Sequence, residues 1–121
     1  MQNNKILVID DNSEVRMLVS IILSSEKFIV SSVNNGQEAI EYLKNNELPN
    51  LIILDHNMEI MNGPEFLLAI EKELPLVFKK VPIVMMTAHG AHMIAKNKAT
   101  EILTKNGSFD QIVNLAKKYC V

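Results

Sequence analysis

Three short runs that are apolar at every position constrain the fold of this chain most strongly. They occupy residues 6–9, 51–54 and 83–86. A strand with one face in solvent alternates apolar and polar residues, whereas a strand covered on both faces is apolar throughout. The inner strands of a parallel sheet are covered in this way. The runs therefore predict a parallel sheet that has helices on both of its faces.

Two weaker strand-like runs and several helical segments separate these three. Residues 28–33 alternate in polarity and residues 101–103 are short, so we expect these two strands at the edges of the sheet. The first helical segment, which follows the first strand, has an apolar stripe at the i, i+3, i+4, i+7 spacing. Further helix starts that resemble capping boxes stand at Asn35, Asn62 and Ser108, and a weaker helix is expected within residues 90–98.

The predicted order of elements is a strand and a helix repeated five times. Right-handed crossover connections place the helices of such a chain on both faces of one sheet. We therefore expect an α/β fold of the flavodoxin-like type, a doubly wound, five-stranded parallel sheet with strand order 2-1-3-4-5. The length of 121 residues suits a single domain over residues 1–121.

Composition and charge exclude several classes of protein. With 48% hydrophobic and 21% charged residues, the chain has enough apolar side chains for a core and does not resemble a disordered protein. A net charge of −2 gives no support to nucleic-acid binding. The sequence shows no signal peptide and no apolar stretch of about 18 residues, so we expect no membrane insertion and a cytoplasmic location. Cys120 is the only cysteine, which excludes an internal disulfide.

Residues that can support chemistry stand where the predicted strands end. In an open parallel sheet, ligands bind beyond the carboxyl ends of the strands, at the point where the strand order reverses. The first and third strands are neighbours in the expected order, so the carboxylates that follow them share one crevice. The residues at the strand ends are Asp10 and Asp11 after the first strand, Asp55 after the third, Thr87 after the fourth and Lys105 after the fifth.

Three carboxylates in one crevice repel one another unless a cation joins them. Mg²⁺ prefers oxygen ligands and commonly lies between carboxylates and a phosphate. Lys105 adds a fixed positive charge, and Thr87 offers a hydroxyl donor. A carboxylate nucleophile, a metal and two groups able to bind phosphoryl oxygens together predict aspartyl-phosphate chemistry.

Each of these residues also has a purely structural interpretation. Residues 10–13 are suited to capping the first helix, and Asp55 alone reads as a helix cap or a loop acid. Thr87 alone is typical of a turn, and Lys105 alone of a solvated surface. The functional interpretation is favoured because all five side chains fall at successive carboxyl ends of strands. The three histidines have no cysteine companions, and their spacings make no standard zinc pattern.

Five motifs follow one another along the chain. They are Ile6-Leu7-Val8-Ile9-Asp10-Asp11-Asn12, Asn35-Gly36-Gln37-Glu38-Ala39, Leu54-Asp55-His56-Asn57-Met58 with Met61-Asn62-Gly63, Pro82-Ile83-Val84-Met85-Met86-Thr87-Ala88, and Leu103-Thr104-Lys105. Any one of them is a weak signal, but five in this order, with their spacing, are specific. Over its whole length the chain resembles the receiver domains of two-component response regulators.

The resemblance implies how a metal is held. Asp11, Asp55 and the backbone carbonyl of Asn57 would bind Mg²⁺ directly, and Asp10 would bind it closely or through water. It also implies how the phosphoryl group is handled. Asp55 would accept this group, and Lys105 would pair with Asp55 and then with the phosphoryl oxygens.

The resemblance further implies a switch with protein partners. Thr87 would move to hydrogen-bond the phosphoryl group and carry the change into residues 88–106. The usual donor is a phosphohistidine on a sensor histidine kinase or a phosphotransfer protein. A receiver catalyses only its own phosphorylation and dephosphorylation, so we expect no enzyme acting on outside substrates. Output would pass to a downstream protein or a fused output domain, and a homodimer would use the face made by residues 90–98, 101–103 and the last helix.

The sequence departs from the family pattern at three positions. The family usually has proline where Glu59 stands; its absence is worth about 0.4–1 kcal/mol of stability, and we expect no effect on the chemistry. The family usually has an aromatic residue at the position of Ile102, and its ring swings inward in the switch. Isoleucine cannot make that swing. A proline in a cis peptide usually follows the lysine. Since a cis bond before another residue costs about 2.5–4 kcal/mol, we predict a trans Lys105–Asn106 bond.

Two other functions are compatible with parts of the sequence. The changes at positions 102 and 106 would suit an interaction module that keeps the fold without the switch, but the set of residues at the strand ends is intact. A Mg²⁺-dependent phosphohydrolase would need an Asp-x-Asp motif after the first strand and room for a cap domain, and the sequence has neither. It also has no Walker lysine loop and no Gly-x-Gly-x-x-Gly motif, which argues against nucleotide binding.

Overall fold

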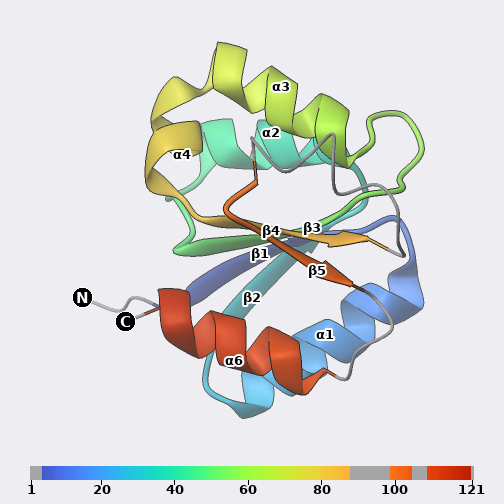
Figure 1. The fold of residues 1–121 in the computed structure, drawn as a ribbon, viewed down its shortest axis with the longest axis vertical. Helices are drawn as coiled ribbons and strands as arrows, with labels where there is room; N and C mark the ends of the chain where they lie inside the picture. Colours follow the sequence, from blue (N-terminus) through green and yellow to red (C-terminus); the bar gives the residue numbers. More distant parts are fainter. Residues whose placement is uncertain (1–3, 88–98, 105–108, 121) are drawn as a thin grey trace.

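A computed structural model of the chain describes residues 4–87, 99–104 and 109–120. Within these residues, five strands form one parallel sheet in the order β2-β1-β3-β4-β5 (Figure 1). This confirms the predicted fold class and strand order. The strands are β1 (Lys5–Ile9), β2 (Ile29–Val33), β3 (Leu51–Asp55), β4 (Ile83–Thr87) and β5 (Glu101–Thr104).

Helices cover both faces of the sheet, as the apolar runs predicted. In Figure 1, α2, α3 and α4 lie over one face, and α1 and α6 lie over the other. The described helices are α1 (Ser13–Ser25), α2 (Gly36–Asn45), α3 (Gly63–Glu73), α4 (Pro75–Lys80) and α6 (Asp110–Tyr119).

The side chains of β1 show why its run is apolar throughout. Leu7 and Ile9 belong to the core on the side of α2, α3 and α4, whereas Ile6 and Val8 belong to the core against α1 and α6. All four are buried, and burying a side chain of this kind stabilises the fold by about 1.5–3 kcal/mol. Since neither face of the strand meets solvent, neither set can be polar. The same alternation divides β3 and β4 between the two cores.

The register of the strands brings their carboxyl ends level with one another. Ile9 is paired with Val33 on one side and with Leu54 on the other. Asp55 is paired with Met86, and Thr87 is paired with Thr104. Residues that follow the strands therefore meet at one edge of the sheet.

Side-chain caps determine where α1 and α3 begin, just beyond this edge of the sheet. The side chain of Asn12 caps α1 by accepting from the backbone N–H groups of Glu14 and Val15. At α3, the Asn62 side chain accepts from the Glu65 N–H, and the Glu65 carboxylate accepts from the Asn62 N–H. This is the predicted capping box.

The cap of α2 differs from the predicted capping box. The Asn35 side chain accepts from the Glu38 N–H at 2.9 Å, as expected. The Glu38 carboxylate, however, accepts from the N–H of Asn34, one residue before the cap, also at 2.9 Å. The same two side chains thus fasten both the helix start and the turn that leads into it.

One helix was not predicted, and two predicted features fall outside the described residues. The short helix α4 begins at Pro75, directly after α3, and buries Val77. Proline is suited to a first turn because that turn has no use for its missing N–H. The helix expected within residues 90–98 and the capping box expected at Ser108 lie outside the described residues; α6 begins at Asp110. Of the helices in the described ranges, none has the length and hydropathy to cross a membrane.

Candidate functional site

Three carboxylates meet at the carboxyl edge of the sheet, between β1 and β3. Asp10, Asp11 and Asp55 each offer an oxygen, and these oxygens all lie within 4.8 Å of one another. Asp10 and Asp55 are buried, with 3% and 4% of their surfaces exposed, whereas Asp11 is exposed. The structure therefore brings together the three acids that the sequence placed at the ends of the first and third strands.

Asp10 is held by the turn that joins β1 to α1. Its backbone N–H donates to the carbonyl of Val33 at 3.2 Å, and its Oδ1 accepts from the N–H of Asn12 at 2.9 Å. The guanidinium of Arg16 donates to the Asp10 carbonyl at 2.6 Å. The structural interpretation of residues 10–13 is thus correct for Asn12, which caps α1, while Asp10 faces the acidic cluster.

Asp11 contacts the loop between β3 and α3. Its Oδ2 accepts a hydrogen bond from the backbone N–H of Glu59 at 3.3 Å. Proline at position 59 would have no N–H to give. The residue at position 59 thus contacts one of the acids, whereas the sequence had given no reason to connect it with the site.

Asp55 ends β3, and close packing fixes the backbone that follows it. The His56 N–H donates to the carbonyl of Met86 on β4 at 2.9 Å, and the Gly63 N–H donates to the carbonyl of His56 at 2.9 Å. A Cβ at Gly63 would lie 2.8 Å from the carbonyl oxygen of Asp55 and 3.0 Å from the Cα of His56. Only glycine lets the start of α3 approach the acid so closely.

The remaining predicted site residues are placed in part. Thr87 is buried at the carboxyl end of β4, with 3% of its surface exposed. Asn57 accepts at its Oδ1 from the Nδ1 of His56, with 2.9 Å between the two atoms. Lys105, and with it the predicted trans Lys105–Asn106 bond, lies outside the described residues. Ile102 is partly buried against the core on the side of α2, α3 and α4.

The donor set and its spacing suit a hard divalent cation. Mg²⁺ binds oxygens at about 2.0–2.1 Å, so any two ligands of one ion lie at most about 4.2 Å apart. The acidic oxygens, within 4.8 Å of one another, need only small side-chain movements to reach that spacing. A cation would also relieve the repulsion among three crowded carboxylates.

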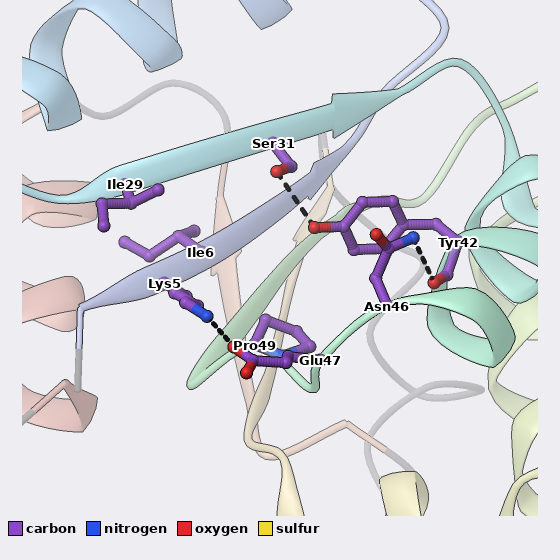
Figure 2. Close-up of a pocket in the computed structure, with 8 residues that line it drawn as sticks. All are labelled: Lys5, Ile6, Ile29, Ser31, Tyr42, Asn46, Glu47 and Pro49. Carbon is purple, nitrogen blue, oxygen red and sulfur yellow. Dashed lines mark hydrogen bonds and ion pairs between the residues drawn. The ribbon is translucent and has the colours of Figure 1, made fainter. Parts of the chain in front are cut away.

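A second hollow, at the opposite end of the sheet, is a poorer candidate (Figure 2). It has a volume of about 200 Å³ and lies where β1 and β2 begin. Lys5 forms an ion pair with Glu47 across it, and its hydrogen bond and charge lower the pKa of the Glu47 carboxyl. The Tyr42 hydroxyl donates to the Ser31 hydroxyl at 3.0 Å. The polar groups there bind one another, and among the described residues it is the acidic cluster that gathers three carboxylates in one place.

Comparisons with known proteins agree with this geometry. The model of the response regulator receiver domain matches residues 6–117. The chain belongs to this family. The receiver domain is 31% identical to sporulation initiation phosphotransferase F of Bacillus subtilis, covering 98% of the chain and 95% of that protein.

A longer relative shares a shorter match. The chain is 40% identical over 87 residues to the CpxR homologue of Haemophilus influenzae, a transcriptional regulatory protein. The match covers 72% of the receiver domain but 35% of that relative. The family therefore includes proteins in which a receiver makes up only part of the chain.

Solved structures show the same fold. The receiver domain superimposes on the response regulator TrrA of Thermotoga maritima with a TM-score of 0.82 and 28% identity, covering 96% of this chain and 98% of that one. That protein was crystallised in complex with Mg²⁺–BeF. The chemotaxis protein CheY4 of Vibrio cholerae gives a TM-score of 0.84 and 27% identity, covering 95% and 97% of the two chains.

Two features of the site had no sequence signal. The hydrogen bond from Glu59 to Asp11 uses a backbone N–H, which nearly every residue carries. The contact between His56 and Asn57 joins adjacent side chains whose directions depend on the loop. By contrast, the acidic cluster followed from the strand ends, and it suits phosphorylation and Mg²⁺ binding in a receiver domain.

Proposed function

We propose that this receiver domain is a phosphorylation-activated switch whose phosphoacceptor is Asp55. The observation that carries the proposal is the acidic cluster, in which Asp55 is buried beside Asp10 and Asp11 at the carboxyl edge of the sheet. Family membership supports it, since receiver domains act in two-component signalling. The complex of TrrA with Mg²⁺–BeF supports it by analogy.

The same residues would hold Mg²⁺. Asp11, Asp55 and the backbone carbonyl of Asn57 would bind it directly, and Asp10 would bind it closely or through water. When bound, the ion neutralises negative charge on the phosphoryl oxygens. Asp55 and Asp10 are held by backbone hydrogen bonds on either side of them, so little reorganisation is needed at the two buried acids.

The transfer step follows from the placement of Asp55. A carboxylate oxygen of Asp55 attacks the phosphorus of a phosphohistidine, the P–N bond breaks, and the imidazole leaves with its electron pair and takes up a proton. Water later attacks the same phosphorus, the bond to Asp55 breaks, and inorganic phosphate is released. The domain thus acts on its own acyl phosphate, with Lys105 pairing with the phosphoryl oxygens and Thr87 donating its hydroxyl proton to them.

Partners follow from this chemistry. The donor is a sensor histidine kinase or a phosphotransfer protein, and the output is a downstream protein or a fused domain. We place the protein in the cytoplasm and treat residues 1–121 as one receiver domain without nucleic-acid contacts of its own. A second copy of the chain would associate through the face of residues 90–98, β5 and α6.

The first test is the intact mass of the protein after incubation with Mg²⁺ and acetyl phosphate. We expect the wild type to gain one phosphoryl group, and the gain to disappear in Asp55→Asn and when Mg²⁺ is removed by chelation. Glu47→Gln, a change beside the start of β1 at the opposite end of the sheet, is the control that retains the gain. A phosphoryl group that persists in Asp55→Asn would refute the assignment.

A further inference from the structure

We propose that the backbone N–H of Glu59 positions Asp11 for the metal, so that the loop between β3 and α3 contributes a second main-chain group to the metal site, beside the carbonyl of Asn57. The inference rests on the proposed function, because it concerns the Mg²⁺ site of that switch. The group that it adds to the site is a backbone N–H, not a side chain. The family's usual proline could not supply this group.

Asp11 is the acid that most needs such a partner. Asp10 and Asp55 are buried, whereas Asp11 is exposed to solvent. An exposed carboxylate rotates among several positions, and fixing it on binding costs conformational entropy. A hydrogen bond from the Glu59 N–H to Oδ2, at 3.3 Å, restrains this rotation and leaves the lone pairs of Oδ1 for a cation.

The loop itself holds the donor in place. The Met61 N–H donates to the carbonyl of Glu59 at 2.7 Å, which closes a γ-turn around Ile60. Ile60 has a φ of 71°, an unfavourable angle for a β-branched residue. With 74% of its surface exposed, Ile60 gains little from packing that would favour this angle.

Both ends of the loop are anchored as well. It leaves β3 at Asp55 and returns through the hydrogen bond from the Gly63 N–H to the His56 carbonyl, at 2.9 Å. The strained turn therefore lies between two fixed points. Strained backbone of this kind occurs mainly at functional sites, where the surrounding structure maintains it.

The test compares two substitutions at the same position. Glu59→Pro removes the N–H, and Glu59→Ala removes the side chain but keeps the N–H. Binding is measured with Mn²⁺ alone, from the loss of the free-ion electron paramagnetic resonance signal, and then with Mg²⁺ as a competitor. Because loss of an outer partner of a metal ligand commonly weakens affinity by about 10–100-fold, and this bond is long and exposed, we expect about a 3- to 10-fold loss in Glu59→Pro. Glu59→Ala should stay within about twofold of the wild type.

Two further variants make the outcome decisive. Replacing the amide that joins Met58 and Glu59 by an ester removes the same hydrogen without a proline ring, and it should weaken binding as Glu59→Pro does. Equal affinities for Glu59→Ala, Glu59→Pro and the ester would overturn the inference. Asp11→Asn separates the two proposals. If it weakens binding while the position 59 variants do not, only the role of the amide fails; if it has no effect, the metal site itself is wrong.

Discussion

Gly63 shows how a single residue without a functional group can determine the geometry of an acid. It begins α3, yet its Cα faces the carbonyl oxygen of Asp55 so closely that even a methyl group would overlap with it. The contact sets how near the helix comes to the end of β3. The position of Asp55 thus depends on a neighbour that donates only a backbone N–H, to the carbonyl of His56.

Gly63→Ala should therefore disturb both stability and phosphorylation. Its Cβ would lie 2.8 Å from the Asp55 oxygen and 2.9 Å from the Cε of Met85. Overpacking of this kind costs about 1–3 kcal/mol, and relief requires the backbone at Asp55 to move. We expect the free energy of unfolding, measured by urea titration, to fall by this amount. We also expect phosphorylation by acetyl phosphate to be slower.

Gly36→Ala is the matched control. The nearest atoms to its Cβ belong to the flexible side chain of Met61, at 2.9 Å. Methionine can move aside, and alanine favours the helix that begins there, so stability should change by less than about 1 kcal/mol. Equal losses of stability in Gly63→Ala and Gly36→Ala would show that the contact with Asp55 does not determine the cost.

The end of α1 has a common capping motif, but one position in it is occupied by a residue that does not favour the backbone angle required there. The Phe28 N–H donates to the Leu23 carbonyl at 3.1 Å and the Lys27 N–H to the Ser24 carbonyl at 3.0 Å. These are the two hydrogen bonds of a Schellman motif, which places the residue after the cap in the left-handed region. Here that residue is Lys27, with a φ of 71°.

Lys27→Gly should stabilise the protein. Glycine adopts this φ without the steric cost that a Cβ brings, although its greater freedom in the unfolded chain offsets part of the gain. We expect the free energy of unfolding to rise by about 0.5–1 kcal/mol, measured by urea titration. Lys27→Ala keeps the Cβ and should give no such gain; a similar rise in both variants would point to the loss of the lysine charge instead.

Elements with a periodic signal could be predicted from the sequence, and the others could not. The apolar runs gave β1, β3 and β4 because both faces of these strands are buried, and Asn62 with Glu65 marked the start of α3. Helix α4 has only six residues, too few to show a stripe. Its one local signal was Pro75 followed by lysines in the last turn.

The acids of the site could be predicted for the same reason, since they follow buried strands. Their hydrogen-bond partners could not. Whether Asp11 reaches the N–H of Glu59 depends on a turn in which Ile60 takes a positive φ, and nothing in an isoleucine favours that angle. Tertiary structure decides such contacts.

The edge strand β5 is joined to α6 by a small polar cluster. The Tyr119 hydroxyl and the Lys118 ammonium both donate to Oε2 of Glu101, the ammonium at 2.9 Å. The hydrogen bond from Tyr119, and then that from Lys118, lower the pKa of the Glu101 carboxyl from its ordinary value of 4.5, against the effect of desolvation. The cluster connects the last strand of the sheet to the last helix of the chain.

This shift makes the stability of the whole protein depend on pH in the acid range. Because the pKa of Glu101 is lower in the folded chain, its ionised form adds stability that is fully present above the unfolded pKa. That stability is lost as the pH falls through the folded pKa. We expect wild type to be more stable than Glu101→Gln at pH 7, with the difference shrinking below about pH 4.

Urea unfolding at a series of pH values measures this difference. Tyr119→Phe removes the largest cause of the lowered Glu101 pKa and should therefore reduce the pH dependence of stability. A difference between wild type and Glu101→Gln that stays constant from neutral to acid pH would contradict the role of the cluster.

The burial of the acids also bears on how slowly each part of the site exchanges its amide hydrogens with solvent. Asp55 ends a strand that is buried at every position, so its amide opens only with the sheet. Asp11 lies on an exposed turn and is restrained by one long hydrogen bond from a strained loop. Local opening of that loop would therefore move Asp11 away from the other two acids while Asp55 stays in place. The proposed metal site would then be lost and regained at a smaller free energy than global unfolding requires.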